Sequence, residues 1–240
     1  GWFNQSGLGW GRQLQANIFG ICCIQHFNHE PCIKCNLQVF TIVLATHNRA
    51  KGAELSAFLN HTYTVKTLSE IGFTSDIPET AETFEANARI KAAAVWKYLQ
   101  ANRLEWDLLA DDSGLEVEAL NGAPGVMSAR FAGELKNDTA NIKLLLSQLQ
   151  THTHRKARFV CALVLLQASG SCLFEGTVSG SIAYEPRGAN GFGYDSVFIP
   201  TGYRSTFAEL NAEQKNQISH RAVAMKKLKE YLSNNTTMGC

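Results

Sequence analysis

The spacing of apolar and polar residues changes several times along the chain, and each change predicts a new element. Residues 39–45 form a β-branched apolar run, which is typical of a buried strand. Apolar residues recur at helical spacing from Phe84 to Leu99 and predict a helix with one buried face. Further helices are predicted over residues 138–149 and 218–232, and further strands over residues 157–167 and 172–183. Alternating helices and strands favour an α/β fold.

Two carboxylates follow an apolar run in the middle of the chain. Residues 108–110 are typical of a buried strand, Asp111 and Asp112 come next, and Ser113-Gly114 predicts a tight turn before an alternating strand over 115–120. A carboxylate at the end of a buried strand can hold a hard cation or take a proton from water. From these residues alone, a turn in which Asp111 and Ser113 cap backbone groups is the simpler alternative.

A polar loop follows the first predicted strand. Residues 46–51 read Thr-His-Asn-Arg-Ala-Lys, and residues 52–59 then predict a short helix. A strand, a loop with a lysine and a helix can direct backbone N–H groups and an ammonium group at an anion. The glycine-lysine pattern of a Walker loop is absent, so an ordinary strand-to-helix connection remains the alternative.

A glycine-rich segment lies before the last short strand. Residues 187–195 read Arg-Gly-Ala-Asn-Gly-Phe-Gly-Tyr-Asp. The glycines let the backbone approach a flat ligand closely, and Phe192 could stack on a nucleobase for about 1–3 kcal/mol. The alternative is a turn between strands that buries Phe192 in the core.

Composition narrows the class of protein. The 240 residues are 45% hydrophobic and 18% charged, as in soluble globular proteins with a buried core. A net charge of +1 argues against binding of nucleic acid over a broad surface, and no apolar run is long enough to span a membrane. Seven cysteines without a regular framework and no secretory signal favour the cytoplasm.

Three segments are expected along the chain: an N-terminal extension over residues 1–37, a domain over 38–233 and a polar tail over 234–240. The extension resembles a tag or an upstream segment because it lacks periodicity. Its His26, His29, Cys32 and Cys35 are suitable zinc ligands, but their spacing is not that of a zinc finger. Whether the extension binds zinc stays open.

The stretch ADDSGLEVEALNGAPGVMSAR, which begins at Ala110, resembles the signature of the inosine/xanthosine triphosphate pyrophosphatases. Four further segments resemble motifs of that family in the same order, and the resemblance extends over residues 39–232. They are the loop 46–51, the segment from Glu79 to Lys91, the glycine-rich segment at 191–195, and residues 215–221.

The resemblance implies a long, twisted, mixed central sheet that is split between two lobes, with helices around it and the active-site cleft between the lobes. It also implies a homodimer that hydrolyses noncanonical purine nucleoside triphosphates to the monophosphate and pyrophosphate. The implied substrates are ITP, dITP and XTP, the implied cofactor is Mg²⁺, and neither nucleic acid nor a membrane is an expected partner.

The resemblance also implies a role for each matching residue. Asp112 is the implied general base, and Asp112 and Glu79 are the implied metal ligands. Lys215, His220 and Arg221 would donate to a keto oxygen of the base, and the amino group of adenine would be rejected. The implied substrate-binding residues are Thr46, His47, Asn48, Arg49, Ala50, Lys51, Lys91, Ser113, Phe192, Gly193, Tyr194, Asp195, Lys215, His220 and Arg221.

Two positions depart from the family pattern. His47 stands where the family usually has glycine, which could alter the backbone angles of the loop. Met127 stands where the family often has an aromatic residue, which could leave the cleft softer and its substrate choice broader. Two rival functions are a pyrophosphatase for pyrimidine or methylated nucleotides and a nucleotide-binding protein without turnover.

Overall fold

The computed structural model describes residues 40–59 and 63–236. The N-terminal extension and its candidate zinc ligands lie outside these residues. The strands are β1 (Phe40–Leu44), β2 (Tyr63–Thr67), β3 (Asp107–Val117), β4 (Lys156–Gln167), β5 (Gly170–Ile182) and β6 (Phe198–Pro200). The α-helices are α1 (Arg49–Phe58), α2 (Phe84–Ala101), α3 (Asp138–Gln148), α4 (Ala212–Ile218) and α5 (His220–Thr236). Short 3₁₀ helices are η1 (Ser69–Ile71), η2 (Glu118–Leu120) and η3 (Gly125–Arg130).

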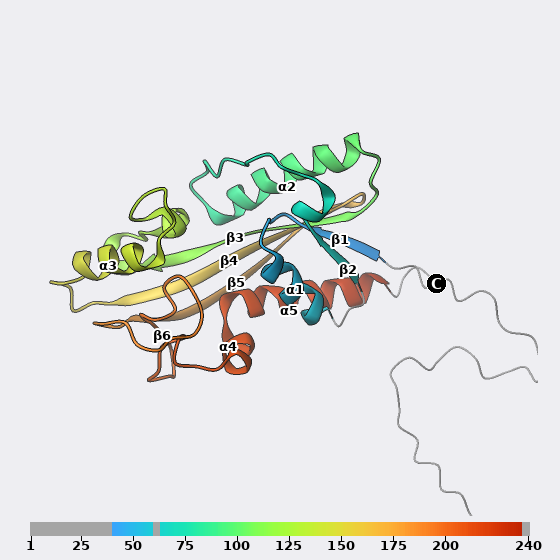
Figure 1. Ribbon diagram of the computed structural model, residues 1–240. Coiled ribbons are helices and arrows are strands. Elements are labelled where there is room, and N and C mark those ends of the chain that lie inside the picture. Colours follow the sequence, from blue (N-terminus) through green and yellow to red (C-terminus); the bar gives the residue numbers. More distant parts are fainter. Residues whose placement is uncertain (1–39, 60–62, 237–240) are drawn as a thin grey trace, which may run out of the picture. The chain divides into compact units, whose positions relative to one another are not determined.

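The strands form one mixed sheet in the order β2-β1-β3-β4-β5-β6. β1 runs parallel to β2 and β3, whereas β3, β4, β5 and β6 pair in an antiparallel manner. Figure 1 shows the long, twisted β3, β4 and β5 extending beyond the short β1 and β2. The expected α/β fold with a mixed central sheet is confirmed.

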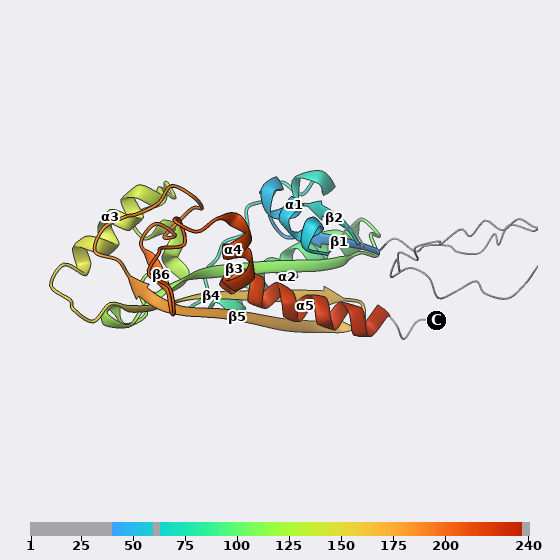
Figure 2. The ribbon, with the colours of Figure 1, turned by 90° about the horizontal axis from the view of Figure 1, so that it is seen from below.

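Helices cover both faces of the sheet. The predicted apolar face of α2 is buried against one face, where Val95 packs with Val43 and Leu108. On the other face, α1 and α5 contribute Leu55 and Leu228 to a second core. In the views of Figures 1 and 2, α2 lies on the side of the sheet opposite α1 and α5. No helix in the described part of the chain is long and apolar enough to cross a membrane.

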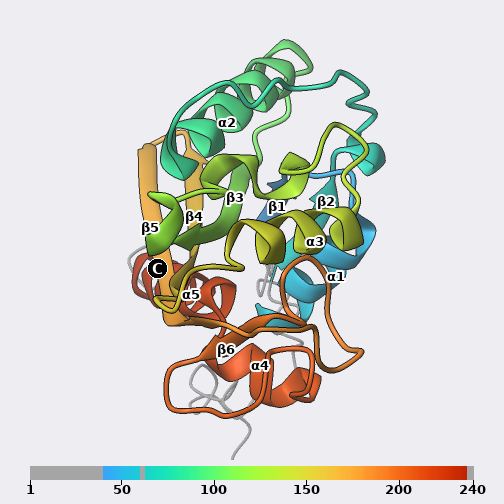
Figure 3. The ribbon, with the colours of Figure 1, turned by 90° about the vertical axis from the view of Figure 1, so that its left-hand side faces the viewer.

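A third core lies at the opposite end of the long strands. There Leu145 of α3 packs with Leu115, Phe198 and Phe207. Figure 3 looks along the sheet from this end, with α3, β6 and α4 toward the viewer. The sheet therefore joins two helix-covered regions, as expected: a lobe with α1, α2 and α5, and a lobe with α3 and β6.

The predicted turn at Ser113-Gly114 is wrong. β3 runs without interruption through Asp111, Asp112, Ser113 and Gly114, which pair with residues of β4. The glycine is needed for packing rather than for a turn: a Cβ atom on Gly114 would lie 2.5 Å from Ser128 Oγ and 2.6 Å from the Gly125 carbonyl oxygen. Residues 118–120 form η2, so the strand predicted to reach 120 ends at Val117.

β3 has an open edge, by which we mean the side of residues 110–117 that faces away from β4. β1 pairs with β3 only from Asp107 to Leu109, and the Ala45 amide donates to the Leu109 carbonyl at 2.8 Å. Beyond that point no described strand continues the sheet on this side. Part of the open edge is covered by the segment around η3, where Ser128 Oγ accepts from the Leu115 amide at 2.8 Å.

Caps and backbone conformation define the ends of three helices. Asn137 caps α3 by accepting from the Ala140 amide. The helix predicted over residues 218–232 corresponds to α5, which is separated from α4 by Ser219 in an extended conformation. Asn211 and Gln214 form a capping box at the start of α4. α5 also continues through residues 234–236, which the sequence assigns to the tail.

Candidate active site

A cleft of about 740 Å³ brings together residues from widely separated stretches of the chain. Its volume lies within the usual range for a small-molecule site. The cleft is lined by acidic residues Glu54, Glu79, Asp111 and Asp112 and by basic residues Lys51, Lys91, Lys136, Lys215 and Arg221. Ser113, Ala129, Phe192, Asn216 and His220 also line it. Most of the residues predicted for the site therefore share one cavity.

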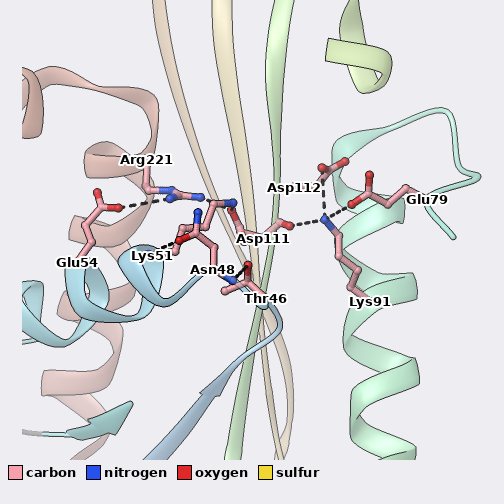
Figure 4. Close-up of polar contacts among 9 residues, drawn as sticks. All are labelled: Thr46, Asn48, Lys51, Glu54, Glu79, Lys91, Asp111, Asp112 and Arg221. Atoms are coloured by element: carbon pink, nitrogen blue, oxygen red, sulfur yellow. Dashed lines mark hydrogen bonds and ion pairs between the residues drawn. The ribbon is translucent and has the colours of Figure 1, made fainter. Parts of the chain in front are cut away.

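Asp111 lies on the α1 and α5 side of β3 (Figure 4). Its carboxylate accepts from Lys51 Nζ at 3.0 Å and from the Arg221 guanidinium, which also approaches Glu54 at 3.4 Å. Burial raises the pKa of Asp111. The positive charges of Lys51, Arg221 and Lys91 lower it by a larger amount, so the net pKa lies well below its usual range. Asp111 is therefore an ionised anchor that holds two cations beside the cleft.

Asp112 lies on the α2 side of the same strand, because successive side chains of a strand point to opposite faces. Its Oδ1 is 3.4 Å from Lys91 Nζ, and its buried Oδ2 has no hydrogen-bond partner among the described residues. Burial raises the pKa of Asp112, Lys91 lowers it, and Glu79 raises it again, so that the net pKa is above its ordinary value. A carboxylate with an unused oxygen and a raised pKa is suited to accept a proton.

Lys91 fills the space between three acceptors. Its Nζ lies 2.7 Å from Glu79 Oε1 and donates to the Asp111 carbonyl oxygen at 2.6 Å, on the open edge of β3. Together with Asp112 these contacts account for the three protons of the ammonium group. Burial lowers the pKa of Lys91, but Asp112, Asp111 and Glu79 raise it, and the net pKa is raised. Lys91 therefore stays charged in the cleft.

Asn87 holds the segment that carries Glu79. Its side chain is fully buried, accepts from the Ala81 amide at 2.9 Å and donates to the Ala81 carbonyl at 3.4 Å. Arg130, from the motif after β3, lies 3.6 Å from the other oxygen of Glu79. Asn87 therefore braces the segment that carries Glu79.

The loop between β1 and α1 lies beside Lys51 (Figure 4). Thr46 Oγ1 accepts from the Asn48 amide at 3.2 Å, and Asn48 Oδ1 accepts from the Lys51 amide at 3.4 Å. His47 is exposed, its Nδ1 lies 3.2 Å from Ser69 Oγ, and its φ angle is not positive. The loop therefore has no backbone need for glycine at this position. Arg49 and Ala50 form the first turn of α1.

The glycine-rich segment presents Phe192 to the cleft. Its side chain is 72% exposed, so the alternative that buries it in the core is wrong. Asp195 is buried and accepts from the Phe192 amide at 2.9 Å and from Lys215 Nζ at 2.5 Å. Lys215 Nζ also lies 4.9 Å from the centre of the Phe192 ring. Asp195 therefore fixes both an aromatic face and a cation at one end of the cleft.

Two neighbours of Phe192 serve the structure around the cleft. The Gly193 amide donates to Asp138 Oδ2 at 2.6 Å, which ties the glycine-rich segment to the start of α3. Tyr194 is buried in the core of the α3 lobe and donates to the Ser128 carbonyl at 2.9 Å. The structure thus places Tyr194 behind the cleft rather than in it.

His220 begins α5 at the base of the same end of the cleft. Its ring stacks on Phe159 with centroids 4.7 Å apart, and its Nδ1 has no hydrogen-bond partner among the described residues. Burial and the charges of Arg221 and Lys215 lower the pKa of His220 to about 3. His220 is therefore neutral at physiological pH and can present one N–H group to a ligand.

The acidic residues do not form a complete metal cage within the described ranges. No group of three or more histidine, cysteine, aspartate or glutamate side chains in the described ranges is arranged to hold a metal ion. Glu79 and Asp112 nevertheless both contact Lys91, and Asp112 Oδ2 accepts no hydrogen bond from any residue that the structure describes. Mg²⁺ usually takes one or two protein carboxylates and completes its shell with water and substrate phosphates, so this pair fits such an ion.

Several cleft residues were missed by sequence reasoning. Glu54 follows Lys51 by one helical turn, which was a usable signal. Lys136 and Asn216 carry no motif, and nothing in their local pattern predicts that they face the cleft. Met127 is 44% exposed on η3 and does not line the cleft, so the expectation that it softens the cleft wall is corrected.

Comparisons with known proteins cover nearly the whole described domain. The family model described as "Ham1 family" matches residues 42–231. A protein of Bacillus subtilis (strain 168) named dITP/XTP pyrophosphatase is 50% identical over 194 residues, covering 79% of this chain and 96% of its own length. A protein of Christiangramia forsetii with the same name is 45% identical over 192 residues, covering 80% of this chain and 98% of its own.

Two solved structures resemble the fold. The Staphylococcus aureus Ham1 protein is 43% identical with a TM-score of 0.74, and the match covers 81% of this chain and 99% of that one. A HAM1 protein from Coxiella burnetii is 38% identical with a TM-score of 0.75, and the match covers 82% of this chain and 100% of that one. The sequence comparisons and the structure comparisons therefore match the same region of the chain.

Proposed function

The chain belongs to the Ham1 family, and on that premise we propose that it hydrolyses noncanonical purine nucleoside triphosphates to the monophosphate and pyrophosphate. The substrates are ITP, dITP and XTP, and the enzyme is a nucleoside triphosphate pyrophosphatase that removes deaminated purines from the nucleotide pool. The observation that carries the proposal is one cleft with cations and Asp112 at one end and Phe192, Lys215 and His220 at the other.

The phosphate end of the cleft follows from its charges. Lys51 and Lys91 are both held in place by carboxylates, and each can offset part of the charge of a triphosphate. Ser113 Oγ is buried without a hydrogen-bond partner among the described residues, so it can donate to a phosphate oxygen. Thr46 and Asn48 lie beside Lys51 and are proposed to add hydrogen bonds to the same phosphates.

The proposed metal is Mg²⁺, bound by Glu79 and Asp112 together with the phosphates. When bound, the ion would neutralise phosphate charge and polarise the anhydride. The chain's own contribution is to hold the two carboxylates: Asn87 braces the segment with Glu79, and β3 fixes Asp112.

Asp112 is the proposed general base. A water molecule attacks phosphorus and passes a proton to Asp112, the anhydride between the α and β phosphates breaks, and pyrophosphate leaves with the bonding electrons. The neighbouring Asp111 is a poor base, because Lys51 and Arg221 hold its pKa well below the usual range. The two adjacent acids thus have separate roles.

The base end of the cleft is proposed to read the keto group at C6 of hypoxanthine and xanthine. Phe192 offers a stacking face, and Lys215 and neutral His220 offer N–H donors. Adenine places an amino group where the keto oxygen would be, so donor would meet donor and ATP would be rejected. Arg221 borders the cleft, but its guanidinium contacts Asp111 and Glu54, so we propose that it also holds Asp111 in place.

We further propose that the protein acts on free nucleotides in the cytoplasm, as a homodimer. The resemblance to the family supports the dimer, and the net charge of +1 supports free nucleotides over nucleic acid. Light scattering on the purified protein tests the oligomeric state: a single species at the mass of one chain would contradict the dimer.

The function is tested by measuring pyrophosphate release from ITP, dITP, XTP, ATP and GTP, each with Mg²⁺ and again with excess chelator. We expect metal-dependent release from the first three and little from ATP and GTP. Preferred release from a pyrimidine or methylated nucleotide would favour the rival pyrophosphatase. Tight ITP binding with no release would favour a binding protein.

A further inference from the structure

Among the described residues, one basic residue that lines the cleft has no acidic partner. Lys51, Lys91, Lys215 and Arg221 each bind a carboxylate at or beside the cleft. Lys136 lines the same cleft but makes no hydrogen bond or ion pair with any described residue. A lysine that is not neutralised by the protein retains its full charge for a ligand.

Lys136 belongs to the base end of the cleft. It lies two residues before Asp138, whose carboxylate accepts from the Gly193 amide at 2.6 Å. That hydrogen bond holds the start of α3 beside the segment that carries Phe192. Lys136 also has a φ angle of 49°, in the left-handed region that lysine seldom adopts. The loop therefore keeps an unfavourable backbone conformation at the residue that supplies the free cation.

Hypoxanthine has no group that needs the positive charge of Lys136. Hypoxanthine and xanthine share the C6 keto group, for which Lys215 and His220 are the proposed donors. Xanthine has a second keto group at C2, and its ring loses a proton near neutral pH, so that it carries negative charge. We propose that Lys136 binds the C2 keto oxygen of xanthine and thereby sets the preference for XTP over ITP. The proposal rests on the proposed function and specifies one substrate of the same site.

The proposal predicts a substrate-specific loss. In Lys136→Gln, we expect kcat/KM for XTP to fall roughly 10- to 100-fold, the cost of one charge-assisted hydrogen bond. The value for ITP should change by less than about threefold, because hypoxanthine has no C2 oxygen. Lys136→Arg should retain most of the XTP preference. The matched control is Lys143→Gln, an exposed lysine on α3 that does not line the cleft.

Equal losses for XTP and ITP would overturn the proposal and assign Lys136 to the phosphates or ribose. Unchanged values for both would also overturn it. A second measurement isolates the base: calorimetric binding of the monophosphates XMP and IMP to the wild type and to Lys136→Gln. We expect weaker binding of XMP alone. If the wild type released no pyrophosphate from ITP, the proposed function would fail, and XMP and IMP binding would still decide the role of Lys136.

Discussion

At the scale of single residues, the site depends on two adjacent aspartates with opposite environments. Asp111 is surrounded by Lys51 and Arg221, and its pKa is lowered. One carboxylate oxygen of Asp112 has no hydrogen-bond partner in the described part of the chain, and the pKa of Asp112 is raised. Strand alternation is the cause, because it points the two side chains at different helices.

Replacing Asp112 by asparagine tests the division of roles. Asp112→Asn keeps the shape of the side chain but cannot accept the proton, so kcat for ITP should fall about 10²- to 10⁴-fold. Binding of ITP, measured by calorimetry, should remain within a few-fold of wild type. Asp111→Asn is the matched comparison: it removes the negative charge that Lys51 and Arg221 share, so nucleotide binding and stability should both decrease. Unchanged turnover in Asp112→Asn would refute its role as the base.

His220 should make stability depend on pH. Its pKa is about 3 in the folded protein, because burial and neighbouring cations disfavour the charged form, but about 6.5 when unfolded. Between these values the unfolded chain binds more protons, so the free energy of unfolding falls as pH falls from 6.5 toward 3. His220→Gln should reduce that slope by up to about 1.4 kcal/mol per pH unit. Urea unfolding from pH 7 to pH 4 measures it, and equal slopes for both proteins would contradict the buried neutral histidine.

At the scale of elements, the cleft uses the open edge of β3. β1 ends beside Leu109, so the backbone of the following residues on that side is available to other groups. Lys91 Nζ donates to the Asp111 carbonyl oxygen, and Ser128 Oγ accepts from the Leu115 amide. The segment around η3 therefore has a structural role. It covers part of the open edge of β3, where backbone groups would otherwise have no hydrogen-bond partners.

The docking of α5 on β5 depends on Gly176. A Cβ atom at this position would lie 2.0 Å from the His220 carbonyl oxygen and 2.5 Å from the Ala224 amide nitrogen. Both are backbone atoms, so Gly176→Ala should push away the start of α5 and cost about 3 kcal/mol or more. Thermal melting should show the loss, together with a raised KM for ITP. Ser179→Ala, at an exposed position of β5, is the control and should have the same melting temperature as the wild type.

Helices and strands could be predicted from the sequence more accurately than the contacts between side chains. The buried face of α2 and the strands β1, β4 and β5 follow from periodicity alone. Gly114 misled the prediction because a glycine required by packing against Ser128 looks like a glycine required by a turn. The sharing of Asp111 by Lys51 and Arg221 also escaped prediction, because it joins three elements that are distant in sequence.

At the scale of the whole molecule, the residues of the site belong to the region that relatives share. The family model matches residues 42–231, and the relatives named above align over 96% and 98% of their own lengths. All the cleft residues lie within that match. The extension over residues 1–37 lies outside that match.

Removal of residues 1–37 should leave activity intact. We expect kcat/KM for ITP to stay within about twofold of the full chain, because every described residue that lines the cleft remains. Elemental analysis of both proteins tests the candidate zinc ligands at the same time. Zinc in the full chain alone would support a metal site in the extension, and a large loss of activity on truncation would show that the extension contributes to the site.

The alternation of Asp111 and Asp112 has an evolutionary consequence. Exchanging one side chain of β3 changes one contact, but adding or deleting a residue before Asp111 would turn every later side chain to the other face of the sheet. The acid that accepts protons would then meet Lys51 and Arg221, and the anchor would meet Lys91. Selection therefore acts on the length of this strand as well as on its side chains, because a change of length exchanges the surroundings of both acids at once.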